Sequence, residues 1–446
     1  MVSGSSRRGM RAILHIDFNS YFATVEQQAN PRLRGKPIGV TGGDRMKRTV
    51  LGAASVEAKR FGVKTGMQIW EARKLCPDLI LVSGDSDKYL EVTKRFIGIL
   101  KDYSPYLEVF SIDEVFLEVA ARDFAAPYMI ALEIKYRISR EIGEWIRCSI
   151  GISYNKLMAK LAGSLIKPDG LVVIANQEEA IKVLDRMELD GICGIGPRIK
   201  KRLFNMGVTN FQQLRAVPLP ALLASFKSYG QTLYNYSRGL DNSLIIPFYE
   251  KPEVKSVGHR HTIDHDTSDP VEIKQILLKL TELVARKLRA KKLVGRTVSC
   301  WFRYALEFPS VTLPAERGVF RKAKGIYSSA LPQNDKIHFT GDGMQVTIPY
   351  TDDGLEIFQA GWKAFQTMWS GDKIRMIGVS ISNLKPQTPQ NLSFLEENHT
   401  REVITKALDK INDKYGEFTL QRGILLQTPN IRRMPNPFLA DRRFKL

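Results

Sequence analysis

The stretch FSIDEVFLEV, residues 110–119, combines a strand pattern with two charges that a strand does not easily accommodate. Its apolar residues are typical of a strand, yet Asp113 and Glu114 stand side by side in its middle. In a regular strand neighbouring side chains point to opposite faces, so one of the two carboxylates would turn toward the core. We therefore predict a hairpin with both acids near its tip, where neighbouring side chains no longer have to oppose each other.

A third carboxylate, Asp17, lies at the end of the predicted strand RAILHIDF, residues 11–18. If the hairpin tip reaches this strand end, three acids come close together and repel one another unless a cation lies between them. Carboxylate oxygens without cysteine or histidine ligands favour Mg²⁺. The alternative is that Asp113 and Glu114 form a solvated pair on a surface loop, which is the usual environment of such a pair. The apolar flanks favour the metal site.

Length and composition indicate a globular protein of several domains. The chain has 446 residues, which is too long for one ordinary hydrophobic core. No apolar run reaches the ~18 residues that a membrane span needs, and residues 1–10 lack the apolar segment of a secretory signal. We expect a disordered leader, a cytoplasmic protein and four reduced core cysteines. The cysteines are Cys76, Cys148, Cys193 and Cys300.

The formal net charge of +19 is the strongest compositional signal. Such an excess of lysine and arginine attracts a polyanion, and nucleic acid is the first candidate. An anionic membrane surface or simple solubility would need the same charge. The charge therefore predicts a class of partner and does not predict a reaction.

Helix and strand patterns alternate without the glycine-rich signature of a dinucleotide fold, which favours the α+β class. We predict helices over residues 86–102, 126–145 and 155–166, with a strand over 147–153. A second α+β unit follows a linker with two prolines. Its first long helix is expected to begin at Asp269, which has the side chain of an N-cap.

Seven motifs occur in one order and at coherent spacing along residues 11–385. They are HIDFNSYFATVEQ, GKPIGV, EAKRFGVKTGM, SIDEVFLEV, GISYNKLMAKLAGSLIKPDG, GICGIG and KSVGHRHT. Together they closely resemble the Y-family DNA polymerases, most of all the DinB branch. The resemblance implies a right-hand polymerase with a ferredoxin-like palm, small fingers, a helical thumb and an α+β little finger.

The resemblance also implies domain boundaries that agree with the predicted elements. They are a leader at 1–10, a palm at 11–24 and 78–168, fingers at 25–77, a thumb at 169–240, a linker at 241–251, a little finger at 252–384 and a C-terminal tail at 385–446.

In this family the acids that match Asp17, Asp113 and Glu114 are catalytic and hold two Mg²⁺ ions. The backbone carbonyl at the position of Phe18 is a further metal ligand. The implied reaction is transfer of a nucleotide to a primer 3′-hydroxyl, with the metal ions activating the hydroxyl and neutralising the leaving pyrophosphate. The implied activity is template-directed DNA synthesis of the translesion type, with low fidelity and no proofreading.

The resemblance places the incoming nucleotide beside a second set of residues. Phe22 matches the steric gate, a ring that leaves no room for a ribose 2′-hydroxyl, although a core position on a helix is the alternative. Lys167 matches the lysine that contacts the triphosphate, and Lys156 and Lys160 share its polar helix face. Backbone N–H groups of Asn19 and Ser20 are implied as further contacts. The remaining predicted contacts are Tyr21, Ser55 and Lys59.

The fingers depart from the family pattern at two positions. Val56 and Lys59 stand where the family usually has tyrosine and arginine. Val56 has no hydroxyl to donate, and Lys59 lacks the bidentate fork of arginine. We therefore expect weaker or redistributed contacts to the triphosphate, with Ser55 or Arg60 in a position to compensate.

Three segments are predicted to bind partners. The sequence GICGIGPRIKKRL resembles a helix-hairpin-helix, which implies DNA contacts at Gly194, Gly196, Lys200 and Lys201. In the little finger, the apolar alternation over residues 298–304 leaves the other strand face for DNA. The tail sequence QNLSFLEE resembles a sliding-clamp motif, and packing on its own domain is the alternative. The clamp residues would be Gln390, Leu392, Phe394 and Leu395.

The sequence thus predicts a monomeric translesion DNA polymerase whose partners are primer–template DNA, a dNTP and a sliding clamp. We expect it to be associated with the nucleoid. The alternative is a polymerase-like accessory or DNA-binding protein without catalysis. Such a homologue would be expected to lose its acids, and this chain has all three.

Overall fold

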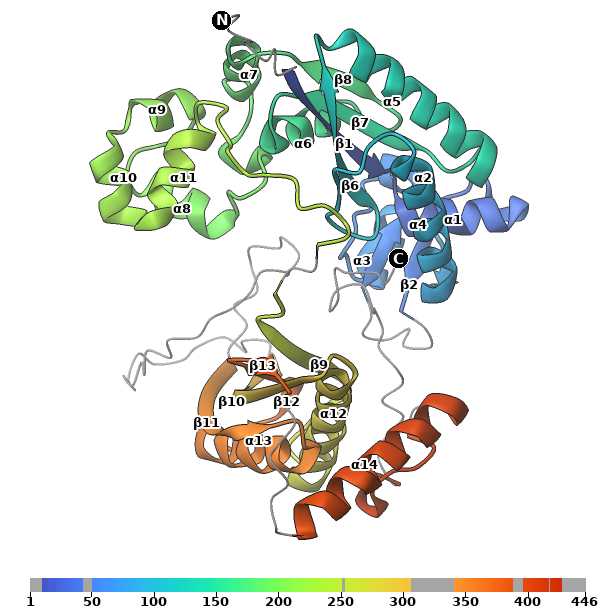
Figure 1. Cartoon of the computed structure of the whole chain (residues 1–446), viewed down its shortest axis with the longest axis vertical. Coiled ribbons are helices and arrows are strands. Elements are labelled where there is room, and N and C mark those ends of the chain that lie inside the picture. Colours follow the sequence, from blue (N-terminus) through green and yellow to red (C-terminus); the bar gives the residue numbers. More distant parts are fainter. Residues whose placement is uncertain are drawn as a thin grey trace, which may run out of the picture. The chain divides into compact units, whose positions relative to one another are not determined.

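The computed structural model describes residues 10–42, 50–250, 253–305, 341–387, 396–416 and 418–426. The chain divides at the predicted linker into a first unit containing Met1–Lys251 and a second unit, Pro252–Ala440 (Figure 1). Residues 1–9 of the predicted leader lie outside the described residues. Among the described residues, no helix is long and apolar enough to cross a membrane.

A five-stranded sheet forms the centre of the first unit (Figure 1). Its central strand β1 has five consecutive buried positions, residues 12–16, as the apolar run predicts. The thumb was predicted to begin at residue 169, but β8 extends the palm sheet by pairing parallel to β7. The strands in order are β5 (Leu107–Val109), β6 (Glu114–Ala121), β1 (Met10–Phe18), β7 (Cys148–Ser153) and β8 (Leu171–Ile174).

Helices cover both faces of this sheet. On one face the Phe18 ring packs against Phe96 of α4, with 4.2 Å between ring centroids. On the other face α6 approaches so closely that a Cβ added at Gly163 would lie 3.1 Å from the His15 ring. The helices are α1 (Tyr21–Ala29), α4 (Ser86–Lys101), α5 (Ala125–Arg137) with a π-helical turn at Ile138–Ile142, and α6 (Lys156–Leu165).

The fingers contain a three-stranded sheet in the order β3-β2-β4. Strand β4 pairs parallel to β2, so residues 80–83 belong to this sheet. The predicted boundary instead places residues from 78 onward in the palm. Its elements are β2 (Ile38–Thr41), β3 (Leu51–Ala54), α2 (Val56–Arg60), α3 (Ile69–Leu75) and β4 (Ile80–Ser83), after a short helix at Pro31–Leu33.

The thumb consists of short helices, as predicted, and their apolar core continues into helix α6 of the palm. The prediction that every cysteine is a core residue is wrong for Cys193, which is exposed beside the glycine turn of the thumb. The helices are α7 (Gln177–Leu184), a short turn at Leu189–Gly191, α8 (Pro197–Phe204), α9 (Phe211–Ala216), α10 (Leu219–Phe226) and α11 (Ser228–Tyr236).

The second unit is an α+β sandwich with two helices on one face of a four-stranded sheet (Figure 1). Asp269 caps α12 as predicted, accepting a 2.9 Å hydrogen bond from the backbone N–H of Val271. The sheet order is β11 (Gly341–Thr351), β10 (Leu293–Tyr304), β12 (Ile374–Ser382) and β9 (Ser256–Thr267), with β13 (Lys385–Pro386) on β10 and with helices α12 (Pro270–Ala290) and α13 (Gly354–Met368).

Part of the predicted tail belongs to this second unit. Helix α14 (Glu396–Tyr415) is held to α12 by a bidentate ion pair, in which Arg289 donates to Asp409 over 2.6 and 2.9 Å. After the helix, Leu425 in the short turn Gly423–Leu425 is 2% exposed and joins the core of the unit. The prediction of a separate tail is therefore wrong for these residues, whose sequence pattern is too polar to reveal the core contact.

Candidate active site

The predicted hairpin is present and carries the acids at its tip. Strand β5 ends at Val109 and β6 begins at Glu114, so Asp113 lies in the tip. The tip is fastened to β1, because the backbone N–H of Phe18 donates to the carbonyl of Asp113 over 3.0 Å. Asp17 stands directly opposite Glu114 in the register of β1 and β6. The hairpin is therefore confirmed, and Asp17 and Glu114 meet across neighbouring strands.

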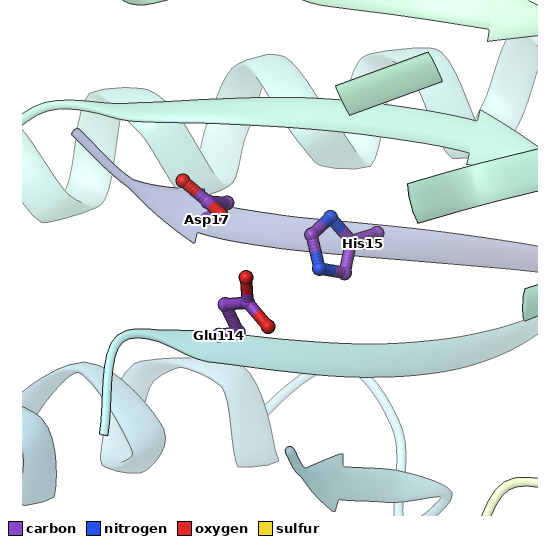
Figure 2. Close-up of side chains that lie close together, drawn as sticks. All are labelled: His15, Asp17 and Glu114. Carbon is purple, nitrogen blue, oxygen red and sulfur yellow. The ribbon is translucent and has the colours of Figure 1, made fainter. Parts of the chain in front are cut away.

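A histidine that the sequence analysis missed lies beside two of these acids. His15 precedes Asp17 by two residues on β1, so both side chains lie on one face, near Glu114 of the adjacent strand (Figure 2). One ligand atom from each of these three side chains lies within 4.8 Å of the others. Asp113 lies outside this group, and its carboxylate accepts a 2.6 Å hydrogen bond from the hydroxyl of Ser111. The spacing of two along a strand was the available sequence signal.

Lysines from α6 and the segment after it neutralise the acids. Lys167 Nζ lies 2.7 Å from Asp17 Oδ1, and Lys160 Nζ lies 2.7 Å from Glu114 Oε2. The predicted polar face of α6 is thus present, but in this structure its lysines bind carboxylates of the palm sheet.

Burial raises the affinity of two of the acids for protons. It raises the pKa of Asp17 above its ordinary value, and Lys167 offsets only part of that rise. Burial also raises the pKa of Asp113, with the negative charge of Glu114 acting in the same direction. A cation beside these groups would lower both pKa values by favouring the ionised carboxylates. The electrostatics therefore suit a site that takes up positive charge.

Glu114 and His15 are affected differently by the same surroundings. Burial is the largest influence and acts to raise the pKa of Glu114, but the charge and hydrogen bond of Lys160 and the hydrogen bond with Asp17 together bring the pKa below its ordinary value. Burial lowers the pKa of His15 to about 3, and the charge of Lys160 contributes to this shift. The His15 ring is therefore neutral at pH 7, and Glu114 is ionised.

A cavity of about 530 Å³ opens beside Asp17 and Asp113. Its wall contains these acids together with the basic residues Lys59, Arg60 and Lys167. Its complete lining is Asp17, Phe18, Asn19, Ser20, Tyr21, Phe22, Gly52, Ala53, Val56, Lys59, Arg60, Thr65, Asp113, Lys167 and Pro168. The palm and the fingers both contribute, so the cavity can hold an anionic ligand next to the acids.

The ring of Phe22 forms part of the cavity wall and stacks on a second aromatic ring. The Phe22 and Tyr89 rings are nearly parallel, with 4.4 Å between centroids and 16° between planes. Tyr89 is fixed in turn, because its hydroxyl donates to Glu26 over 2.7 Å. The structure therefore places Phe22 at the cavity and does not bury it in the core.

Three predicted nucleotide contacts are engaged elsewhere. The Ser55 hydroxyl is fully buried at the start of α2, where it accepts the backbone N–H of Ala58 over 3.2 Å, and Ser55 does not line the cavity. The backbone N–H of Asn19 donates to the carbonyl of Arg147 over 2.9 Å. In this structure both groups already have partners within the fold, although Asn19 lines the cavity.

The third predicted nucleotide contact is Tyr21. Its hydroxyl donates to the carbonyl of Tyr89 over 2.8 Å and contacts Thr93. This hydroxyl is committed to the palm core, although the residue reaches the cavity wall. Ser20 also lines the cavity and begins α1 in the left-handed region, with a φ of 51°.

Comparisons with known proteins agree along the chain. A model of the impB/mucB/samB family matches residues 16–164, and the model of that family's C-terminal domain matches 254–394. A model described as the DNA polymerase-iota thumb domain matches 190–241. DNA polymerase IV of Moorella thermoacetica is 33% identical over 420 residues, which cover 93% of this chain and 96% of that protein. The chain belongs to the DinB branch of the Y-family DNA polymerases.

Two further proteins support this membership. DNA polymerase IV of Pelotomaculum thermopropionicum is 32% identical over 94% of this polymerase and 97% of that protein. A solved Y-family DNA polymerase chimera, Dbh-Dpo4(243-245)-Dbh, superposes with a TM-score of 0.66 at 21% identity, covering 84% of this chain and 99% of that one. The fold of this polymerase is thus the multidomain α+β architecture of its family.

In the thumb of this polymerase, the glycine turn has the conformation that its sequence predicts. Gly194 has a φ of +105°, and Gly196 caps the N-terminus of α8. Lys200, however, lies 2.8 Å from Asp190 and 3.2 Å from Glu188. The predicted DNA contact at Lys200 would therefore have to compete with two carboxylates of the thumb.

In the second unit of this polymerase, the strands divide into an apolar and a polar face as predicted. Cys300 and Phe302 of β10 are buried against the helices. The open face carries Arg260, Trp301 and Arg303, with glycine at position 378 between the first two. Burial lowers the pKa of Arg303, and the nearby charges of Arg375 and Arg260 act in the same direction.

Proposed function

We propose that this polymerase transfers nucleotides at the cavity between palm and fingers, with Asp17, Asp113 and Glu114 as its catalytic acids. The observation that carries the proposal is the composition of the cavity wall. The wall contains two acids of the palm, Asp17 and Asp113, together with the basic residues Lys59 and Lys167. An anion with three phosphates needs this combination of positive charge and metal-binding oxygens.

Two Mg²⁺ ions are the cofactors that the donor set fits best. The carboxylates of Asp17, Asp113 and Glu114 and the carbonyl of Phe18 are hard oxygen donors. Burial raises the pKa of Asp17 and of Asp113, so both carboxylates gain from a neighbouring cation. When bound, such ions supply charge stabilisation to the attacking 3′-hydroxyl and to the leaving pyrophosphate.

Basic residues at the wall would orient the triphosphate. Lys167 holds Asp17 through an ion pair of 2.7 Å, and its ammonium group is exposed enough to turn to a phosphate. Lys59 and Arg60 face the same cavity from α2. Arg60 supplies the guanidinium fork that the Lys59 position lacks, which supports the expected redistribution of contacts.

Phe22 would act as the steric gate. Its ring is held by stacking on Tyr89, so it cannot easily move away from an incoming sugar. A ribose 2′-hydroxyl would meet this ring, whereas a deoxyribose would not. Selection of dNTPs over ribonucleotides then follows from the shape of the site.

Primer–template DNA would be held through its backbone by two basic surfaces. The Gly194–Gly196 turn offers amide groups at the start of α8, with Lys201 nearby on the same helix. The open sheet face of the second unit offers Arg260 and Arg303. Such contacts position DNA without reading its sequence.

Two proposals about partners rest on the sequence. The clamp-motif residues lie outside the described residues, and their resemblance to a clamp-binding peptide supports docking on a sliding clamp. The motif lies between β13 and α14, which both belong to the second unit. We further propose that the enzyme acts as a monomer in association with the nucleoid.

Primer extension with Mg²⁺ and dNTPs tests the catalytic proposal. Asp113→Asn should abolish extension while the affinity for primer–template DNA, measured by fluorescence anisotropy, stays unchanged. The matched control is Asp123→Asn, because Asp123 is an exposed acid at the start of α5 whose capping bond asparagine can also make. Normal extension by Asp113→Asn would refute the assignment, and a folded wild type without extension would favour the non-catalytic alternative.

A further inference from the structure

The environment of His15 does not explain why this position holds a histidine. The residue is 2% exposed on the central strand β1. Its ring packs on Phe116 with 4.7 Å between centroids, and Gly151 of β7 stands opposite it in register. Gly163 of α6 covers the ring from the helix side. These neighbours offer apolar contact and no polar side chain.

Both ring nitrogens of His15 lack a hydrogen-bond partner among the residues that the structure describes. Burying an unpaired polar group has an energetic cost, which phenylalanine or leucine would avoid at the same place. The carboxylates of Asp17 and Glu114 have ligand atoms within 4.8 Å of the ring nitrogen (Figure 2), and their lysine partners Lys167 and Lys160 would give way to a bound cation. Carboxylate oxygens and an imidazole nitrogen are donor atoms that can surround one metal ion lying between them.

We propose that His15 is a metal ligand, so that the palm site has a mixed nitrogen and oxygen donor set with Asp17 and Glu114. This inference rests on the proposed metal site and adds a ligand to it. Donor atoms bound at about 2.1 Å to one ion lie at most about 4.2 Å apart, so small rotations of the two carboxylates would complete the site. The absence of a side chain at Gly163 lets α6 cover the ring, because a Cβ there would lie 3.1 Å from His15 Nδ1.

The donor set determines which ions would use this ligand. Imidazole nitrogen suits first-row transition ions, whereas Mg²⁺ prefers oxygen and binds mainly through carboxylates. The site should therefore bind Mn²⁺ with His15 coordinated, and it should bind Mg²⁺ through the acids alone. Loss of His15 would change the preference between the two ions more than it changes the affinity for Mg²⁺.

Pulsed electron paramagnetic resonance on the full chain with Mn²⁺ alone tests this directly. A coordinated imidazole produces a nitrogen coupling in the spectrum, and labelling with ¹⁵N-histidine should change that coupling. His15→Gln should remove the coupling and weaken Mn²⁺ binding by about tenfold or more, with little change for Mg²⁺ in a competition titration. The control is His259→Gln, which removes a histidine of the second unit whose ring contacts Lys287.

Each outcome of the experiment decides one of the two proposals. Suppose that the wild type binds Mn²⁺ and that Asp17→Asn abolishes this binding. The acid site then stands, and the His15 inference is overturned if the wild type shows no nitrogen coupling or if His15→Gln still shows it. If the wild type binds no Mn²⁺, both fall. Should His15→Gln fail to fold by circular dichroism, the labelled wild type decides, because a histidine coupling that Asp17→Asn removes supports the inference and its absence overturns it.

Discussion

The palm sheet and the little-finger sheet use their helix-covered faces in opposite ways. In the palm, the layer between β1 and α6 contains His15, Asp17 and Glu114, and Lys160 enters it from the helix. In the second unit, the corresponding layer is mainly apolar, with residues such as Val298 at 0% exposure. There the arginines Arg260 and Arg303 stand on the open face of the sheet.

The two arrangements of charge suit two different functions, catalysis and DNA binding. A charge between sheet and helix is partly removed from water, so neighbouring charges act on it strongly and hold it in one geometry. A charge on an open face stays hydrated and is screened by salt, so it suits contacts with a DNA backbone that must slide. The palm is therefore suited to catalysis, and the little finger is suited to binding the DNA backbone.

The largest expected effect comes from removing a palm acid. Asp17→Asn should lower the rate of nucleotide addition by more than about a hundredfold. Mutating even a residue that only orients a metal ligand typically lowers metal affinity or activity by about ten- to a hundredfold. Thermal stability should not fall, since the variant removes a buried charge whose partner Lys167 is exposed enough to be solvated. Single-turnover kinetics and thermal melts check the two parts, and a lower melting temperature would contradict the second.

A substitution in the apolar layer of the second unit should change the stability of that unit and not the catalytic reaction. Leu425 extends this layer from the C-terminal segment, so Leu425→Ala should cost about 2–3 kcal/mol in the free energy of unfolding of that unit. Leu426→Ala is the matched control, because Leu426 is 72% exposed. Denaturant unfolding measures the difference, and equal stability of the two variants would place the segment outside the core.

Sugar discrimination in the palm should change with a single ring. Phe22→Ala should lower the preference for dNTPs over ribonucleotides by at least about tenfold, since the wall that excludes the 2′-hydroxyl is lost. Phe61→Ala serves as control, because Phe61 is an exposed ring of the fingers that does not line the cavity. Unchanged discrimination in single-nucleotide insertion would refute the steric-gate assignment.

The smallest effect is expected on the open sheet face. Arg260→Ala should weaken DNA binding by about fivefold or less at moderate salt and reduce the slope of log affinity against log salt by about 0.9. Lys363→Ala removes the same charge from the exposed side of α13, on the helix layer, and should leave the slope unchanged. Equal slopes for the two variants would show that the open face does not carry the DNA contact.

Much of the architecture could be predicted because it depends on local patterns. The apolar run of β1 and the charge conflict in residues 110–119 predicted the hairpin and the meeting of the acids. The motifs and their order predicted the family. The sheets that β4 and β8 join could not be predicted, because a short strand acquires its sheet from distant pairing partners.

The site predictions differ from the structure where a side chain makes a hydrogen bond or an ion pair within the fold. Ser55 has the right position in the motif, but its hydroxyl closes the first turn of α2. The pairing of Lys160 with Glu114 depends on the packing of α6 on the sheet, which spacing along the helix does not contain. His15 resembles a core residue in the sequence, and only its neighbours on three elements distinguish it from one.

The division between chemistry in the palm and holding in the little finger can be tested in one data set. The rate of single-nucleotide addition is measured against DNA concentration for the wild type, Asp113→Asn and Arg260→Ala. We predict that Asp113→Asn loses the maximal rate and keeps the half-saturating DNA concentration, whereas Arg260→Ala keeps the rate and raises that concentration. A full maximal rate for Asp113→Asn, or a lost maximal rate for Arg260→Ala, would contradict the division.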